Sequence, residues 1–187
     1  LARWAGVSNE EPWFLDADLD LPHEQHEDCA SELGEGWRRC CERKGVRLRA
    51  IRSDIVLTDG SNRLTREIDS KGVALSRLSM QLLRSVWEPG DGEPAWVIAD
   101  KHGGRNRYDD LLAEVLDGEM IFRDEEGAER SVYRVGSSVI HFQTRAEEHL
   151  PVALASMVSK YVRELAMVLF NRFWSQHVPD LKPTKGY

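Results

Sequence analysis

The sequence predicts an α/β (α+β) fold, in which strands and helices follow one another in mixed order without a repeat. The short apolar run 95–100 stands between turn residues and is typical of a buried central strand. Residues 119–144 hold three short strand-like runs separated by turns, which indicates an antiparallel meander. Residues 151–177 carry apolar side chains at helical spacing. With 187 residues, 41% of them hydrophobic, the chain can bury the core of a single domain, residues 1–187.

The first half of the chain is expected to begin irregularly, because prolines interrupt residues 1–24. Residues 29–43 then predict a helix with Leu33, Trp37, Cys40 and Cys41 on one face. Residues 47–57 alternate apolar and basic side chains and predict a strand with one exposed face. The Asp-Gly-Ser-Asn sequence at 59–62 predicts a turn after that strand.

The second half alternates helices with strands. Residues 72–87 predict an amphipathic helix that ends at the Pro-Gly-Asp-Gly sequence 89–92. After the strand 95–100, residues 108–116 predict another helix, and the meander takes its turns at 125–127 and 136–137. The last helix places Pro151 in its first turn, where proline is tolerated. On its polar face Ser156, Lys160 and Glu164 recur every four residues, and a simple surface ion pair of the last two is the plainest interpretation.

Charge is unevenly distributed along the chain. The formal net charge of −7 argues against a polyanion as partner, since nucleic-acid-binding proteins usually present a basic surface. Residues 10–35 hold ten acids and no Lys or Arg, whereas residues 36–85 hold twelve Lys and Arg against five acids. The middle of the chain is therefore basic, either as a contact for nucleic acid or as an ordinary solvated surface.

The strand 95–100 ends on a carboxylate that is followed at once by glycines and cations. Asp100 precedes Lys-His-Gly-Gly-Arg-Asn-Arg, and ligands in α/β sheets often bind at the carboxyl ends of strands. Two glycines let a ligand approach the backbone, and Arg105 and Arg107 could contact phosphates beside a metal held by Asp100. The alternative is an ordinary Gly-Gly turn whose charged side chains are solvated.

The three cysteines, Cys29, Cys40 and Cys41, are odd in number and do not suggest a disulfide framework or a zinc site. No run is long and apolar enough for a membrane span, and no signal peptide is visible. We therefore expect a cytoplasmic protein.

The last helix resembles the helix signature of ribonuclease HII, which runs Ala-Ser-Ile-(Leu/Val)-Ala-Lys-x-x-Arg-Asp. This chain matches it at Ala155, Ser156, Lys160 and Arg163, with Glu164 in place of the aspartate. The resemblance spans roughly residues 46–187 and leaves the acidic segment 1–45 poorly matched. It implies a ribonuclease H-like mixed sheet with flanking helices, an inserted β-hairpin and a long C-terminal helix.

Other family features follow in the same order along the chain. The Lys-Gly-Tyr sequence after the family's helix is matched by 185–187, and an asparagine before a helix is matched by Asn62. An aspartate that ends a central strand is matched by Asp100. The last catalytic acid, just before a proline and the helix signature, is matched by Glu147, with Glu148 as the neighbouring choice.

The resemblance implies metal-assisted hydrolysis of a phosphodiester in an RNA/DNA hybrid or in ribonucleotide-containing DNA. Asp100 and Glu147 would hold Mg2+ or Mn2+ in a two-metal site, since these ions prefer oxygen ligands. Residues that would contact nucleic acid are Asn62, Arg105, Arg107, Ser156, Lys160, Lys185 and Tyr187.

The chain departs from the family pattern in several places. An extra hairpin separates Asp100 from Glu147, the loop after Asp100 is unusual, and Glu147 replaces an aspartate. The family's opening Asp-Glu pair and Gly-Arg-Gly loop have no counterpart, so we expect a fragment of a longer chain. Two alternatives stay open: a catalytically inactive module that binds nucleic acid or a protein partner, and a nuclease with another substrate.

Overall fold

The computed structural model describes residues 11–15, 19–23, 27–68 and 70–186. The chain divides into two compact units, each considered by itself. The first unit comprises the chain up to residue 51 together with residues 160–187, and the second comprises residues 52–159.

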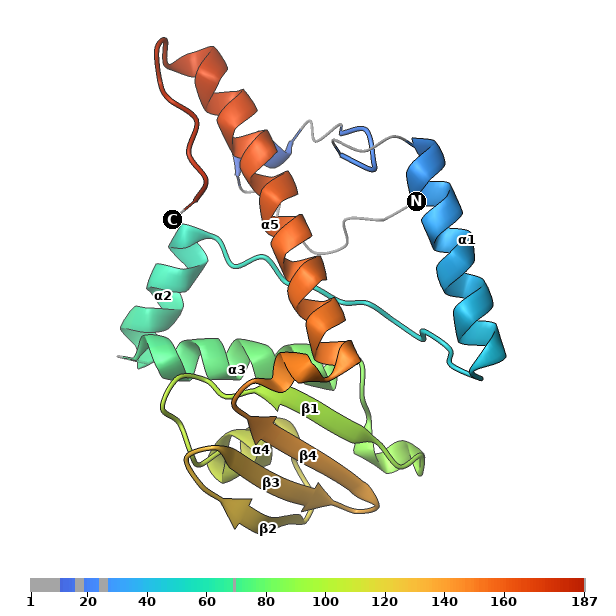
Figure 1. Cartoon of the computed structure of the whole chain (residues 1–187). Coiled ribbons are helices and arrows are strands. Elements are labelled where there is room, and N and C mark those ends of the chain that lie inside the picture. The colour runs from blue at the N-terminus through green and yellow to red at the C-terminus, as the bar shows by residue number, and fades with distance from the viewer. Residues whose placement is uncertain (1–10, 16–18, 24–26, 69, 187) are drawn as a thin grey trace. The chain divides into compact units, whose positions relative to one another are not determined.

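The second unit is built on a four-stranded mixed sheet (Figure 1). Its strand order is β1-β4-β3-β2; β1 runs parallel to β4, and the other neighbours are antiparallel. The α/β class and the meander predicted from the sequence are therefore confirmed. The strands are β1 (Trp96–Asp100), β2 (Ile121–Glu126), β3 (Arg130–Val135) and β4 (Ser138–Gln143).

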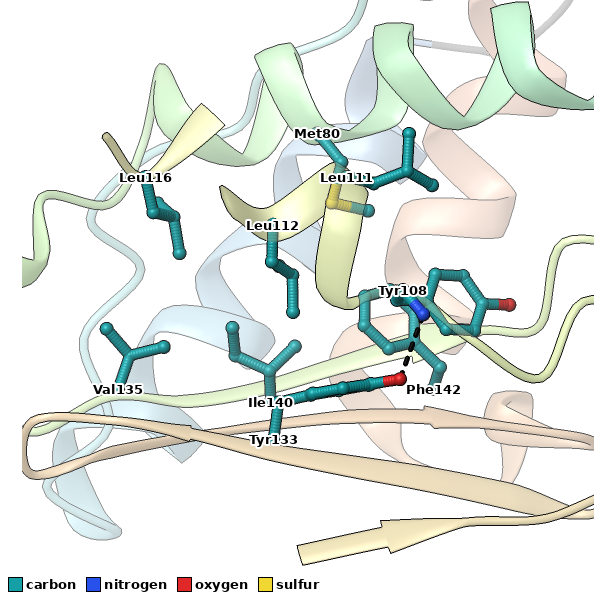
Figure 2. Packing of buried hydrophobic residues seen from close by; sticks show 9 residues of the cluster. All are labelled: Met80, Tyr108, Leu111, Leu112, Leu116, Tyr133, Val135, Ile140 and Phe142. Carbon is teal, nitrogen blue, oxygen red and sulfur yellow. Dashed lines mark hydrogen bonds between the residues drawn. The ribbon is translucent and has the colours of Figure 1, made fainter. Parts of the chain in front are cut away.

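One face of this sheet is covered by α3 (Lys71–Arg84) and α4 (Asp109–Val115), as Figure 2 shows. On β4, Ile140 and Phe142 alternate with half-buried residues and point into the core, as strand periodicity requires. Tyr108 stacks on Phe142 with ring centroids 3.7 Å apart. Each fully buried side chain of this size stabilises the fold by about 1.5–3 kcal/mol. The core comprises Met80, Tyr108, Leu111, Leu112, Leu116, Tyr133, Val135, Ile140 and Phe142.

Strand β1 lies at an edge of the sheet and not at its centre, so the predicted central position is wrong for the described residues. Val97 and Ala99 pack against the core, but Trp96 on the other face is 64% exposed. The apolar sequence of β1 therefore reflects one buried face together with an exposed indole.

The predicted strand over 47–57 is wrong, because residues 46–57 form no regular element. Four of its apolar side chains are more than 40% exposed, namely Val46, Leu48, Ile51 and Val56. Alternation produces a strand only where a neighbouring strand supplies hydrogen bonds, and no described strand pairs with this segment.

The predicted turn at 59–62 is also wrong, because these residues open α2 (Thr58–Ile68). The N–H of Ser61 donates to the carbonyl of Leu57 at 2.8 Å and closes the first helical turn. Asn62 is therefore an exposed residue inside a helix, not a residue between a strand and a helix.

The other predicted helices are confirmed. They appear as α1 (Glu27–Arg43), α3, α4 and α5 (Leu150–His177), and Pro151 is the second residue of α5. In α5 the apolar face buries Leu165 and Leu169, whereas Ser156, Lys160 and Glu164 are exposed. No helix of the described chain is long and apolar enough to cross a membrane.

Within the first unit, aromatic residues of the early chain pack on α5. Trp13, in the short 3-10 helix η1 (Pro12–Phe14), meets Phe170 edge to face with centroids 5.0 Å apart. Asn171 of α5 exchanges two hydrogen bonds with the backbone of Thr184, at 2.8 and 3.0 Å. These bonds fix the segment that leads to Lys185 along the helix.

A hydrogen-bonded pair of tyrosines satisfies polar groups inside the core. The buried N–H of Tyr108 donates to the hydroxyl of Tyr133 at 2.8 Å (Figure 2), and that hydroxyl donates to Glu126 Oε1 at 2.8 Å. Burial, together with Glu126, raises the pKa of Tyr133 to about 12. The phenol therefore stays protonated and keeps its donor at neutral pH.

Tyr133→Phe is expected to destabilise the protein by about 1–3 kcal/mol, because the Tyr108 N–H is left buried without an acceptor. Urea unfolding measures the loss. Tyr161→Phe is the matched control, since the Tyr161 hydroxyl accepts a single exposed hydrogen bond from the N–H of His23. It should cost no more than about 0.5 kcal/mol; equal losses in the two variants would contradict the role given to Tyr133.

Candidate site at the carboxyl ends of β1 and β4

Three connecting segments meet at one end of the strands, where β1 and β4 finish and β3 begins. Asp100 at the end of β1 is in register with Gln143 at the end of β4, and Gln143 is in register with Arg130 at the start of β3. The loop 101–107, the turn 127–129 and the segment 144–149 therefore all leave the sheet on this side. Ligand sites in sheets with parallel strands often lie at these carboxyl ends.

Asp100 is joined directly to the segment that carries the second predicted acid. Its Oδ1 accepts the N–H of Ala146 at 3.0 Å, and Ala146 is fully buried at the start of the 3-10 helix η3 (Ala146–Glu148). Glu147 is the next residue, and both it and Asp100 are exposed to solvent. One hydrogen bond thus joins the side chain of Asp100 to the residue before Glu147, 46 positions later in the sequence.

Lys101, the residue after Asp100, holds the following loop in place. Its ammonium, which has three N–H donors, lies within hydrogen-bond distance of four acceptors: the Arg105 carbonyl at 3.1 Å, Asn106 Oδ1 at 2.9 Å, the Gly127 carbonyl at 2.6 Å and Ser131 Oγ at 3.2 Å. Burial lowers the pKa of Lys101, and the charge of Glu126 opposes that shift. The loop is therefore attached to the β2–β3 turn through a single cation.

His102 attaches the same loop to the core. Its ring Nδ1 lies 2.9 Å from the buried Ser76 Oγ, and its backbone N–H donates to the Tyr108 hydroxyl at 2.9 Å. Burial lowers the pKa of His102; the charge of Arg105 adds to this shift, and Asp100 opposes it. Since Ser76 also bonds the Gly72 carbonyl at 2.8 Å, this serine has a structural role.

The two arginines predicted to contact phosphate differ in their surroundings. Arg107 pairs with Asp109 at 3.3 Å and lies 3.8 Å from Glu126. The side chain of Arg105 has no hydrogen bond or ion pair with any residue in the described stretches of the chain. Between these arginines and Lys101, Gly103 adopts a φ of 60° that favours glycine, and both Gly103 and Gly104 are exposed.

The other residues predicted to contact nucleic acid do not all lie at the carboxyl ends of β1 and β4. Asn62 and Ser156 belong to the same unit, but neither has a hydrogen bond or ion pair to Asp100 or Glu147 within the described chain. Lys160 belongs to the first unit, where it lies 4.0 Å from Glu164. Lys185 is exposed in that unit, and Tyr187 lies outside the described residues.

The acids present are suited to a hard cation but do not form a complete site. Asp100 and Glu147 supply carboxylate oxygens, the ligands that Mg2+ and Mn2+ prefer. However, no group of three or more His, Cys, Asp and Glu in the described chain is placed to hold a metal ion. A two-metal centre requires more ligands than this pair provides.

Several residues that hold the loop after β1 in place were not predicted as site residues. Lys101 and His102 look like ordinary loop residues in the sequence, and their partners Ser76, Gly127 and Ser131 are distant along the chain. No local pattern marks such contacts. The only available signal was a lysine directly after the acid that ends a strand.

Lys101→Met should destabilise the second unit by about 1–3 kcal/mol, because several acceptors lose a charged donor at once. Amide hydrogen exchange should become faster in residues 102–107 and 127–129. Lys160→Met is the matched control, since the Lys160 side chain is 70% exposed and has only a distant ion pair. Unchanged amide exchange in both segments would contradict the role of Lys101 in holding the loop against the β2–β3 turn.

Stability should fall as the pH is lowered through the range in which His102 titrates. The folded pKa of His102 lies below its ordinary value of 6.5, so the unfolded chain takes up a proton first. The stabilisation is present above about pH 6.5 and is lost as the pH falls through the lower folded pKa. Urea unfolding at a series of pH values measures this effect. Arg105→Gln should weaken it, because that cation lowers the pKa of His102.

Comparison with known proteins does not identify this site. No family model, no curated protein and no solved structure matches the chain.

Proposed function

We propose that this protein is a metal-dependent endonuclease that hydrolyses the RNA strand of RNA/DNA hybrids, or embedded ribonucleotides, in the manner of ribonuclease HII. The observation that carries the proposal is the hydrogen bond from Ala146 to Asp100. It places the residue before Glu147 against the acid at the end of β1. The side chain of one acid selected by the resemblance therefore lies against the residue that precedes the other.

The order of elements around the acids also supports a ribonuclease H-like scaffold. The strand that ends on Asp100 runs parallel to β4, which leads through η3 directly into α5. The β2–β3 hairpin comes between β1 and β4 in the sequence. It extends the sheet on the far side of β4, as an inserted hairpin would. We therefore include the ribonuclease H-like fold in the proposal.

In this proposal the chain binds and orients a phosphodiester beside Asp100 and Glu147. Mg2+ or Mn2+, when bound, would supply activation of water and stabilisation of the leaving oxygen. Asp100 and Glu147 would be two of its ligands, with Glu148 as the neighbouring choice. Because the described residues offer no third ligand at this place, the pair defines the position of the site and not its full composition.

The nucleic-acid contacts follow from the charges and from the resemblance. Arg105, which has no described partner, is the better of the two loop arginines for a phosphate, since Arg107 would have to leave Asp109. The resemblance assigns further contacts to Asn62, Ser156, Lys160, Lys185 and Tyr187.

A binding module without catalysis is the second candidate. The observation in its favour is that no group of three metal-ligating side chains occurs in the described chain. Such a module would bind hybrid duplexes in a salt-sensitive manner and leave them intact.

The test is cleavage of a duplex that contains ribonucleotides in the presence of Mg2+ or Mn2+. Asp100→Asn and Glu147→Gln should each lower the rate by at least about a hundredfold, as is typical when a group that stabilises developing charge is removed. Asp117→Asn is the control, because this exposed acid lies in the turn that follows α4. Comparison of Glu147→Gln with Glu148→Gln separates the two candidate ligands.

Each outcome distinguishes between candidates. Undiminished cleavage by Asp100→Asn would refute the assignment of the site. Salt-sensitive binding without cleavage by the unmodified protein would favour the binding module. Equal cleavage of all-DNA duplexes would instead indicate a nuclease with a different substrate.

A further inference from the structure

A polar pocket lies at the same end of the strands; its lining includes Glu148 and Gln143, the residue in register with Asp100. Its volume is about 690 Å3. The segment after β4 and the β2–β3 turn form its walls, and the N–H of Thr144 donates to the carbonyl of Glu129 at 2.9 Å between them. The pocket is lined by Glu125, Glu129, Arg130, Gln143, Thr144, Arg145 and Glu148.

The charges of this pocket are only partly neutralised. Glu125 is paired with Arg130 through contacts of 2.5 and 2.8 Å. The side chains of Arg145, Glu129 and Glu148 have no partner among the residues that the structure describes. The pocket therefore presents one available guanidinium and two available carboxylates.

Most arginines around the sheet are not available in this way. From Arg77 to Arg145, six arginines form ion pairs, and only Arg105 and Arg145 have side chains without a described partner. Both of them flank the strand end that carries Asp100. The six paired residues are Arg77, Arg84, Arg107, Arg123, Arg130 and Arg134.

Arg145 also has an unfavourable backbone conformation. Its φ of 55° and ψ of 35° lie in the left-handed region, which glycine or asparagine adopts more readily. The bond from Ala146 to Asp100 fixes the residue that follows it, and the Arg145 carbonyl accepts the N–H of Glu148 at 3.2 Å. An arginine held in a glycine-like conformation beside a pocket is more easily explained by its side chain than by its backbone.

We propose that this pocket binds a ribose phosphate unit of the nucleic-acid strand, with Arg145 on the phosphate and Glu148 accepting a hydrogen bond from a ribose hydroxyl. This inference rests on the proposed function. A simple anion fits poorly, because two unpaired carboxylates would repel it, and a simple cation would be repelled by Arg145. A phosphate next to a single hydroxyl donor satisfies Arg145 and Glu148, and the 2′-hydroxyl, which is the free hydroxyl of a ribose within a strand, distinguishes RNA from DNA.

Fluorescence anisotropy measures the affinity for a ribonucleotide-containing duplex and for the all-DNA duplex. The buffer contains Ca2+ in place of Mg2+ or Mn2+, and a gel checks that the strands stay intact. Arg145→Gly should weaken binding of the first about tenfold or more, because a charge-assisted hydrogen bond is lost. It should also raise the urea midpoint, since glycine tolerates this φ. Arg145→Asn, which suits the same backbone, should weaken binding equally, and Arg145→Lys should weaken it less.

Asp180→Gly is the matched control, because Asp180 is the other described non-glycine residue with a positive φ, at 65°, and belongs to the other unit. It should raise the urea midpoint and leave affinity unchanged. Glu148→Leu should lower the preference for the ribonucleotide-containing duplex, whereas Glu148→Gln, which keeps an acceptor oxygen, should retain more of it. Competition by free AMP but not dAMP would show that a single nucleotide suffices.

The possible failures can be told apart. If Arg145→Gly and Arg145→Asn bind like the unmodified protein while cleavage still requires Asp100, the pocket assignment is overturned and the proposed function stands. If Glu148→Leu keeps the full preference for ribonucleotides, the role of Glu148 is overturned. If the unmodified protein neither binds nor cleaves either duplex, the inference and the proposed function fail together.

Discussion

The ammonium of Lys101 is the contact on which the geometry of the candidate site depends. Its four acceptors come from the loop that follows β1, from the turn between β2 and β3, and from β3 itself. Carbonyls in a tight loop beside a core are costly when they lack donors, and one cation satisfies two of them here. Because Lys101 follows Asp100 directly, the same contact sets the direction in which the chain leaves the strand end.

Asp100 combines a structural role with its proposed chemical role. Its Oδ1 is engaged with the Ala146 N–H, so the carboxylate helps to build the turn that carries Glu147. This bond restricts rotation of the side chain, which orients any ligand of this acid. Replacement of Asp100 therefore disturbs the placement of Glu147 as well as removing a charge, and comparison with Glu147→Gln is needed to separate these effects.

The sequence was sufficient where periodicity and burial agree. The helices predicted over 72–87, 108–116 and 151–177 are found at 71–84, 109–115 and 150–177, and the meander is also found. Apolar spacing matches burial in α4 at Leu111 and Leu112 and in α5 at Leu165 and Leu169, whereas in α3 Leu75 is exposed and Ala74, Ser76 and Met80 are buried. Residues 47–57 show the limit of this reasoning, since alternation without a neighbouring strand does not produce a strand. The approach of the segment that carries Glu147 to Asp100 was expected only through the family resemblance. The left-handed Arg145 and the four-acceptor contact of Lys101 could not be predicted, because both depend on segments that meet only after folding.

The overall charge constrains how this protein could bind a polyanion. A chain of net charge −7 is repelled by nucleic acid at long range, and this repulsion is screened beyond about 10 Å at 0.1 M salt. Most cations around the sheet are already paired with acids, so little basic surface remains to compensate. Binding must then depend on a few short-range contacts, and Arg105 and Arg145 are placed to make them on either side of Asp100. With so few phosphate contacts, the salt dependence of affinity should be shallow compared with that of a basic nuclease, since each neutralised phosphate contributes about one unit to the slope.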